Sequence, residues 1–276
     1  MIELKNVSFS YYLPEKVDVI KNINLIINKG EFLVIIGRNG SGKSTLGRLI
    51  SFILEPTEGE IIIDDKKPKI DIDYIDIRKK IGMVFQNPDN QIVSQIVEED
   101  IAFGLENLNY SEEEIENKID EVINEVNLAE YRKFPPNFLS GGQRQKLAIA
   151  GILVMEPQYL VLDEPTSLLD PKGRKDVIEL IKRLNNEGIT IILITHRMEE
   201  AVLGDRVLVL NEGEIFLEGK PEEVFKEVEK IRSVGLSPPV FTYLSYLIKK
   251  ENINIDIKLW KLEEIKKEIL QLKLKI

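Results

Sequence analysis

The sequence has no cysteine, a single histidine and fewer basic than acidic residues. Without cysteine, a disulfide framework and thiol chemistry are excluded. The net charge of −10 at pH 7 argues against a nucleic-acid partner, because such proteins present a basic face. No stretch reaches the roughly 18 apolar residues of a membrane span, and the opening MIELKNVSF does not resemble a secretory signal. These absences favour a cytosolic protein.

What is present favours a globular α/β domain. A chain of 276 residues with 43% hydrophobic content predicts one large domain, or one with a smaller companion. The first sixty-odd residues alternate as strands do, and FLVIIG at 32–37 is typical of a strand buried on both faces of a parallel sheet. From Gln86 the spacing turns helical, which predicts a helical insertion over about 87–155. Strands and helices alternate again from YLVLDEP to RVLVLNEGEI, the latter taken as one strand, so we expect a largely parallel, doubly wound sheet.

The chain after Gly219 is expected to form a separate helical unit. Two helical stretches are predicted there, broken at Pro238-Pro239, and a further amphipathic helix is expected around KLWKLEEIKKEILQL. We therefore divide the chain into a domain over residues 1–220 and an extension over residues 221–276.

A phosphate loop is the strongest local signal. Residues 37–44, GRNGSGKS, match G-x-x-x-x-G-K-[ST] and lie between a buried strand and a helical run, a context that a chance glycine-rich turn would lack. Backbone N–H groups of such a loop surround phosphates, Lys43 reaches the β- and γ-phosphates, and the Ser44 hydroxyl binds Mg²⁺. The expected nucleotide-binding residues are Asn39, Gly40, Ser41, Gly42, Lys43, Ser44 and Thr45.

Polar residues at the ends of three further strands are candidates for catalysis. Asp163 ends an apolar strand and would hold Mg²⁺, while the adjacent Glu164 could polarise a water towards the γ-phosphate; a solvated strand cap is the alternative. His196 ends a neighbouring strand and is expected to hydrogen-bond the γ-phosphate, although a lone histidine is more often structural. Gln86 follows KKIGMVF and could sense the γ-phosphate, or be an ordinary loop glutamine.

A second helix start suited to an anion stands at LSGGQ, residues 139–143. The phosphate loop, Gln86, LSGGQ, LVLDEP, SLLD and His196, in this order, resemble the ATPase domain of ABC proteins over residues 1 to about 220. The resemblance implies a P-loop NTPase with a RecA-like core, an N-terminal antiparallel β-subdomain and a helical signature subdomain. It also implies that Mg²⁺ is held by Ser44, Gln86 and Asp163.

In the same family LSGGQ is called the signature loop, and it faces the nucleotide of another subunit. The resemblance therefore implies that Ser140, Gly142 and Gln143 contact ATP held by a second subunit, and that Asp170 of SLLD couples the two sites. An aromatic residue near the N-terminus stacks on adenine in this family. Tyr11 fits that position, with the adjacent Tyr12 as the alternative.

The run QNPDNQ after the strand KKIGMVF, and the tail up to LSYLI, resemble more narrowly the ATPases of energy-coupling factor transporters, first of the two types, and their cobalt and nickel relatives. This implies an ATP-hydrolysing subunit of a vitamin or micronutrient importer, peripheral at the cytoplasmic side of the membrane, whose extension over residues 221–276 forms dimer contacts. The implied partners are a second ATPase subunit in a homo- or heterodimer, a transmembrane coupling subunit and substrate-binding membrane subunits. Four apolar residues would either contact the coupling subunit or belong to the core: Ile92, Val93, Ile96 and Val97.

Other classes fit less well. A cobalt or nickel importer, or an ordinary ABC importer, is the nearest alternative. A soluble ABC ATPase of translation or DNA repair would usually have two ATPase domains or a long coiled-coil arm, and a P-loop kinase or GTPase would not need LSGGQ. A purely structural nucleotide binder is disfavoured because every catalytic position is filled.

Overall fold

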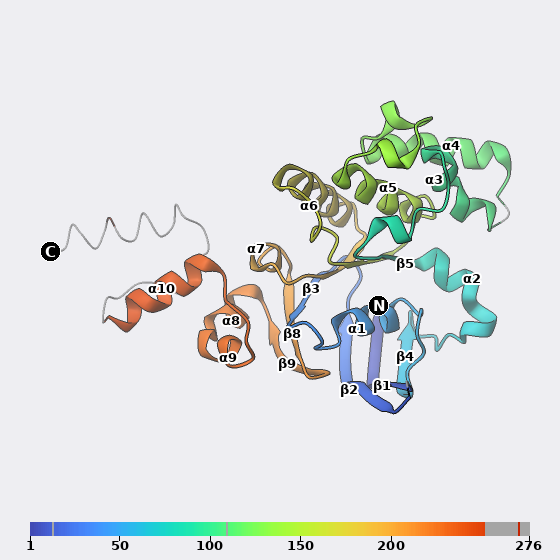
Figure 1. Ribbon diagram of the computed structural model, residues 1–276. Helices are drawn as coiled ribbons and strands as arrows, with labels where there is room; N and C mark the ends of the chain where they lie inside the picture. Colours follow the sequence, from blue (N-terminus) through green and yellow to red (C-terminus); the bar gives the residue numbers. More distant parts are fainter. Residues whose placement is uncertain (13, 109, 252–269, 271–276) are drawn as a thin grey trace.

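A computed structural model describes residues 1–12, 14–108, 110–251 and 270. Its centre is a six-stranded sheet in the order β5-β6-β7-β3-β8-β9, in which only the last pair is antiparallel (Figure 1). The predicted α/β class with a largely parallel sheet is confirmed. The strands are β3 (Phe32–Gly37), β5 (Ile81–Val84), β6 (Tyr159–Asp163), β7 (Thr190–Ile194), β8 (Arg206–Asn211) and β9 (Glu214–Gly219).

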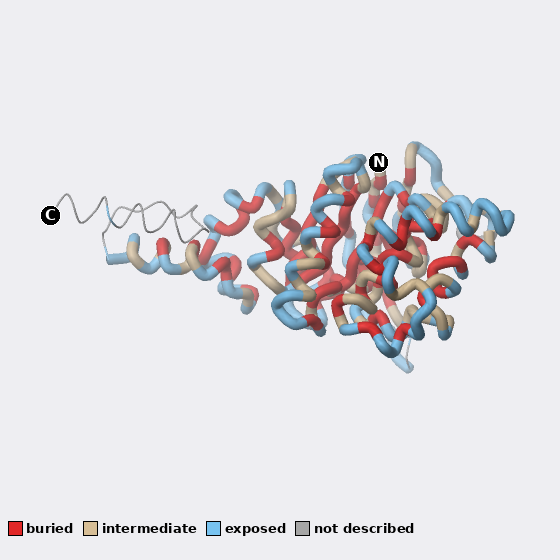
Figure 2. Tube along the Cα trace, turned by 90° about the horizontal axis from the view of Figure 1, so that it is seen from above, coloured by how far each residue is buried: buried red, intermediate tan, exposed pale blue. Residues whose placement is uncertain are grey.

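The apolar run of β3 feeds two separate cores, because successive side chains of a strand point to opposite faces. Phe32, Val34 and Ile36 join one core, together with α5 (Gly141–Leu153) and α6 (Pro171–Asn186). Leu33 and Ile35 join the other, which also contains α1 (Lys43–Ile50). The buried residues are concentrated in the middle of the molecule, with exposed segments around them (Figure 2).

The second core is closed by an antiparallel sheet of three strands. Its order is β2-β1-β4, formed by β1 (Ile2–Tyr12), β2 (Lys16–Ile27) and β4 (Glu58–Ile63). Helix α2 (Ile70–Lys80) follows β4 and leads into β5. The alternation in IDIDYIDI is no signal for a helix, and the sequence predicts none there.

Helices α3 (Val97–Glu106) and α4 (Glu112–Glu125), together with α5, form the helical subdomain beside the sheet (Figure 1). A capping box starts α4: the Glu114 N–H donates to Ser111 Oγ (3.3 Å) and the Ser111 N–H to Glu114 Oε2 (2.9 Å). Four further short elements are η1 (Pro88–Asn90), η2 (Ala129–Tyr131), η3 (Pro136–Phe138) and α7 (Met198–Ala201).

RVLVLNEGEI is not the single strand predicted. It contains β8, a two-residue turn and the first two residues of β9, which together begin a hairpin. Asn211 pairs with Glu214, and the two residues between them, Glu212 (φ 50°) and Gly213 (φ 86°), both adopt left-handed backbone. Two such residues make the tight turn that suits the twist of an antiparallel pair. Glutamate rarely occupies this position, so the turn gave no clear signal in the sequence.

The extension begins with α8 (Pro221–Lys226), α9 (Val228–Ser233) and α10 (Val240–Lys250), at the end of the molecule away from α2 (Figure 1). The break at Pro238-Pro239 is confirmed, since α10 starts directly after Pro239. The first stretch is two helices rather than one, because the chain turns at Glu227. The helix expected around KLWKLEEIKKEILQL lies outside the described residues. In the described part of the chain, no helix is long and apolar enough to span a membrane.

Candidate functional site

The phosphate loop closes tightly between β3 and α1. A Cβ on Gly37 would lie 2.4 Å from the Leu210 carbonyl oxygen and 2.5 Å from Ser41 Oγ, so only glycine fits at the end of β3. Gly42 caps α1 in left-handed backbone (φ 101°), and no side chain bonds to the first N–H groups of the helix. Those N–H groups are therefore available to an anion.

Lys43 is almost fully buried beneath this loop. Its Nζ donates to the carbonyl oxygens of Gly37 and Arg38, each at 2.9 Å. Burial lowers the pKa of Lys43, while the charges of Glu164 and Asp163 oppose that shift. The ammonium group thus lies at the loop's centre, bonded only to backbone carbonyls that phosphate oxygens can replace.

An open cleft of about 440 Å³ lies over the loop. It brings together most of the residues predicted for nucleotide binding with two of those predicted for catalysis. Its lining consists of Val19, Asn39, Gly40, Gly42, Lys43, Ser44, Thr45, Gln86 and Glu164.

Asp163 provides a carboxylate suited to a hard cation beside the loop. Burial raises the pKa of Asp163, and a hydrogen bond from the Ser44 side chain opposes the rise. Its Oδ1 is buried without a hydrogen-bond partner. Among the described residues no group of three or more acidic, histidine or cysteine side chains could hold a metal by itself. One carboxylate and one hydroxyl match the sparse protein ligation of Mg²⁺, which also takes phosphate oxygens and waters.

Glu164 lies at the meeting point of the other predicted catalytic residues. Its Oε2 accepts a hydrogen bond from Gln86 Nε2 (3.1 Å) and is 3.2 Å from His196 Nδ1. Adjacent parallel strands β6 and β7 place Glu164 and His196 at the same edge of the sheet. Glu164 also adopts left-handed backbone (φ 49°), a strain that proteins concentrate at functional sites.

The two candidate adenine-stacking tyrosines are placed differently. Tyr11 is half-buried, packs edge-on against Phe9 with ring centroids 4.8 Å apart, and its hydroxyl lies 3.4 Å from Thr45 Oγ1. Tyr12 is 67% exposed. Because Thr45 belongs to the phosphate loop, Tyr11 is the tyrosine that reaches the site.

The signature loop does not line that cleft. Ser140 is the exposed N-cap of α5, and it exchanges hydrogen bonds with Gln143 in a capping box: Ser140 N–H to Gln143 Oε1 (2.8 Å) and Gln143 N–H to Ser140 Oγ (3.3 Å). Asp170 caps α6 by accepting from the Gly173 N–H (2.9 Å). A Cβ on Gly142 would lie 2.9 Å from Gly173 Cα, so the starts of α5 and α6 touch backbone to backbone. Gly173 was not among the residues predicted for the site.

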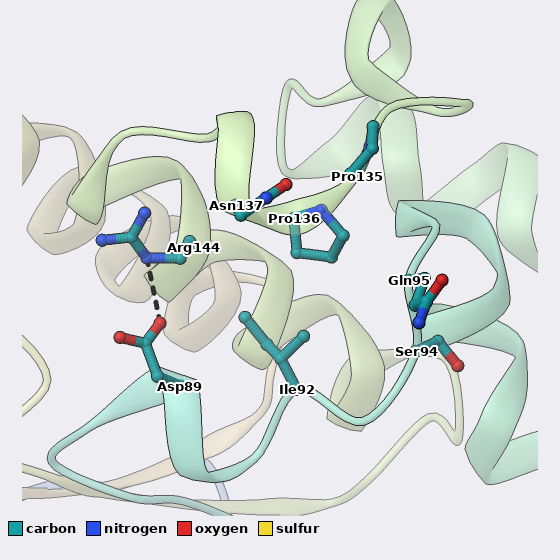
Figure 3. A pocket seen from close by; sticks show the side chains of 8 residues that line it. All are labelled: Asp89, Ile92, Ser94, Gln95, Pro135, Pro136, Asn137 and Arg144. Carbon is teal, nitrogen blue, oxygen red and sulfur yellow. Dashed lines mark ion pairs between the residues drawn. The ribbon is translucent and has the colours of Figure 1, made fainter.

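The segment after Gln86, residues 87–97 (the Gln86 segment), contacts α5 through side chains whose role was not predicted from the sequence. Arg144 Nε lies 3.0 Å from Asp89 Oδ1, and the same guanidinium donates to the Leu139 carbonyl oxygen (2.7 Å). Figure 3 shows this pair on one side of a cleft of about 720 Å³, into which Ile92 points. Arg144 therefore connects the Gln86 segment to the signature loop within one chain.

The four apolar residues of this segment divide between core and surface. Val97 is fully buried, which selects the core among the two alternatives left open by the sequence. Ile92 and Ile96 are half-buried and Val93 is 61% exposed. Asp100 holds the segment in place, because its Oδ1 accepts from the N–H groups of Val93 (2.7 Å) and Ser94 (3.0 Å). Burial raises the pKa of Asp100 against the effect of those two bonds.

A phosphate loop at the end of a central strand, with a carboxylate pair and a histidine on adjacent strand ends, defines a P-loop ATPase. The model of the ABC transporter family matches residues 20–167, and the chain belongs to this family. It is 48% identical to the energy-coupling factor transporter ATP-binding protein EcfA1 of Clostridium novyi, over 99% of each chain.

Solved structures agree with this assignment. CbiO1 from Clostridium perfringens, described as part of the ABC transporter complex cbiONQ, is 38% identical with a TM-score of 0.76, over 90% of this chain and 98% of that one. The ATP-binding cassette MJ0796, in a dimeric post-hydrolysis state bound to ADP and Pi, is 37% identical with a TM-score of 0.72, over 80% and 98%. The predicted fold, with its RecA-like core, antiparallel subdomain, helical subdomain and helical extension, is confirmed.

Proposed function

We propose that this chain is the ATP-hydrolysing subunit of an energy-coupling factor importer, which powers vitamin or micronutrient uptake through a transmembrane partner at the cytoplasmic side of the membrane. The observation that carries the proposal is the full-length likeness to an energy-coupling factor ATP-binding protein, in a chain whose phosphate-loop cleft is lined by Lys43, Ser44 and Glu164, with His196 beside Glu164.

Nucleotide binding follows from the cleft over the phosphate loop. The free N–H groups at the start of α1 and the Lys43 ammonium receive the phosphates, while the Tyr11 ring stacks on adenine. Ser44, Asp163 and Gln86 would hold Mg²⁺, and the unpartnered Asp163 Oδ1 is the atom that fits this role best. When bound, the ion neutralises charge that develops on the phosphate oxygens.

Hydrolysis follows from the cluster around Glu164. Its carboxylate accepts a proton from the water that attacks the γ-phosphate, and His196 and Gln86 hold that carboxylate in place. Gln86 begins the segment that Arg144 ties to α5, so a change at the γ-phosphate reaches the helical subdomain by direct contact.

The signature loop completes the site of another subunit. Ser140, Gly142 and Gln143 stand at an exposed helix start and line no part of their own chain's nucleotide cleft. We infer that they contact ATP held by a second ATPase subunit, with Asp170 coupling the two sites through the contact between α5 and α6. The complete set of motifs is compatible with a homodimer or a heterodimer.

The transmembrane partner docks in an apolar groove of about 600 Å³ between α2, α3, α5 and the Gln86 segment. Exposed apolar side chains gather there, among them Phe103 (47% exposed) and Val93. An amphipathic helix of the partner would bury these residues beside a segment that responds to nucleotide. The remaining apolar side chains of the groove are Tyr74, Ile75, Leu108, Ala148, Ile152 and Met155.

A cobalt or nickel importer is the second candidate, and the likeness to CbiO1 of a cbiONQ complex favours it. The two are separated by what co-purifies with the tagged chain from cells of its source. Several interchangeable small membrane subunits support the energy-coupling proposal, whereas one substrate-dedicated permease contradicts it.

Phe103→Asp tests the docking groove in the same preparation. We expect the membrane subunits to be lost while ATP binding remains, because the new charge lies in the groove and not in the nucleotide cleft. Phe216→Asp is the matched control, since Phe216 is also exposed (39%) but lies on β9, at the opposite edge of the sheet from β5. Retention of the membrane subunits by Phe103→Asp would show that the partner docks elsewhere.

A further inference from the structure

A buried carboxylate joins the two loops that carry Glu164 and His196. Glu200, in α7, is only 3% exposed. Its Oε1 accepts a hydrogen bond from Thr166 Oγ1 (2.5 Å), and its Oε2 accepts one from Thr195 Oγ1 (2.6 Å). Thr166 lies two residues after Glu164, and Thr195 lies directly before His196. One side chain thus bonds to both loops at once.

Each loop is fixed close to its catalytic residue. The Thr195 hydroxyl also accepts from the Arg197 N–H (3.0 Å), so the backbone is held on both sides of His196. On the other loop, the Glu164 carbonyl oxygen accepts from Ser167 N–H (3.1 Å) and Ser167 Oγ (3.0 Å).

The charge of Glu200 is partly compensated where it lies. Arg197 Nε is 3.7 Å from Oε1, and each carboxylate oxygen accepts a short hydrogen bond from a threonine hydroxyl. Removing this carboxylate alone would leave the buried hydroxyls of Thr166 and Thr195 without their acceptor. The distinctive consequence of a carboxylate here is geometric, because only two acceptor oxygens can fix both threonines.

We propose that Glu200 is a positioning residue for ATP hydrolysis. It sets the 3.2 Å approach of His196 to Glu164 without contacting nucleotide. This inference rests on the roles proposed above for Glu164 and His196.

Glu200→Gln in the full chain tests the inference. The amide keeps the shape but removes the charge and one acceptor oxygen, so both threonine hydrogen bonds lose their charge assistance and one threonine can only accept from the new N–H. We expect kcat to fall about tenfold, the cost of one charge-assisted hydrogen bond, with KM for ATP unchanged because the phosphate loop is untouched. Glu199→Gln is the matched control: it removes the same charge from an exposed neighbour on the same helix and should leave kcat unchanged.

The decisive readout is a double-mutant cycle with His196→Ala, in which the rate of single-turnover phosphate release is measured for each variant. If Glu200 acts through His196, Glu200→Gln costs nothing further in the His196→Ala chain. An equal loss in both backgrounds, or normal kcat in Glu200→Gln, overturns the inference while leaving the proposed function intact. Normal turnover by His196→Ala itself would instead contradict the role of His196, and with it the inference.

A second pair of variants keeps the test open if Glu200→Gln fails to fold. Thr195→Ser retains the hydroxyl that donates to Glu200 and should turn over normally, whereas Thr195→Val should lose activity with KM unchanged. Equal activity of the serine and valine variants would overturn the inference.

Discussion

At the scale of single residues, the proposed catalysis depends on where Glu164 is held. Left-handed backbone at the end of β6 turns its carboxylate towards Gln86 and His196. Asp163, one residue earlier, is directed by the strand into the buried edge of the phosphate loop. Two adjacent carboxylates therefore have different surroundings and different proposed roles, one in holding a cation and one in accepting a proton.

Replacing Glu164 with Gln should separate binding from hydrolysis. ATP affinity should remain, because the phosphates are held by α1 and Lys43, while turnover falls about 10²- to 10⁴-fold with the loss of the base. Nucleotide titration and phosphate release measure the two quantities. Glu212→Gln makes the same change at the same left-handed backbone (φ 50°) in the β8–β9 turn and should leave turnover unchanged. Normal turnover by Glu164→Gln would exclude it as the base.

At the scale of elements, the signature loop at the start of α5 and the start of α6, which Asp170 caps, form one unit. Gly142 and Gly173 bring the starts of α5 and α6 into backbone contact, and Arg144 adds the Gln86 segment to the same assembly. A rigid arrangement of this kind lets Gln86, the proposed γ-phosphate sensor, and the signature loop move together.

Gly173→Val should disrupt this unit while leaving the chain's own nucleotide cleft intact. Even a Cβ at this position would lie 2.8 Å from Asp170 Oδ1 and 3.3 Å from Gly142 Cα, so a branched side chain must push α5 and α6 apart. We expect ATP binding to persist and turnover to fall at least tenfold, roughly the effect of 1–3 kcal/mol of overpacking expressed at the signature loop. Lys172→Val, at the exposed neighbouring position, is the control. Wild-type turnover by Gly173→Val would show that the two helix starts tolerate separation.

Local patterns predicted the elements, and contacts between distant residues escaped prediction. FLVIIG and GRNGSGKS were interpretable because a buried strand and a phosphate loop are defined by their own residues. Glu212 concealed a turn because it adopts backbone that glutamate seldom takes. Gly173, Arg144 and Glu200 look like ordinary helix residues, and their importance arises only from partners that the fold brings to them.

At the scale of the whole molecule, the proposed nucleotide site is divided between two chains. One chain supplies the phosphate loop, Glu164 and His196, and its signature loop opens away from them. The extension lies close to the phosphate loop, since a Cβ on Gly235 would be 2.9 Å from Arg38 Cδ. The start of the extension and the proposed ATP site are therefore neighbouring parts of one structure.

The absence of native cysteine makes a direct test of this division possible. Two differently tagged chains, each with Glu164→Gln, carry one cysteine each, Ser140→Cys in one and Asn39→Cys in the other, so only a bond between chains can form. With Mg-ATP and an oxidant, we expect a covalent dimer containing both tags, and none without nucleotide or when Lys43→Ala is added to the Asn39→Cys chain. The same chains without cysteine control for association by other contacts. No cross-link with ATP, in chains that bind it, would contradict a signature loop that completes a neighbour's site.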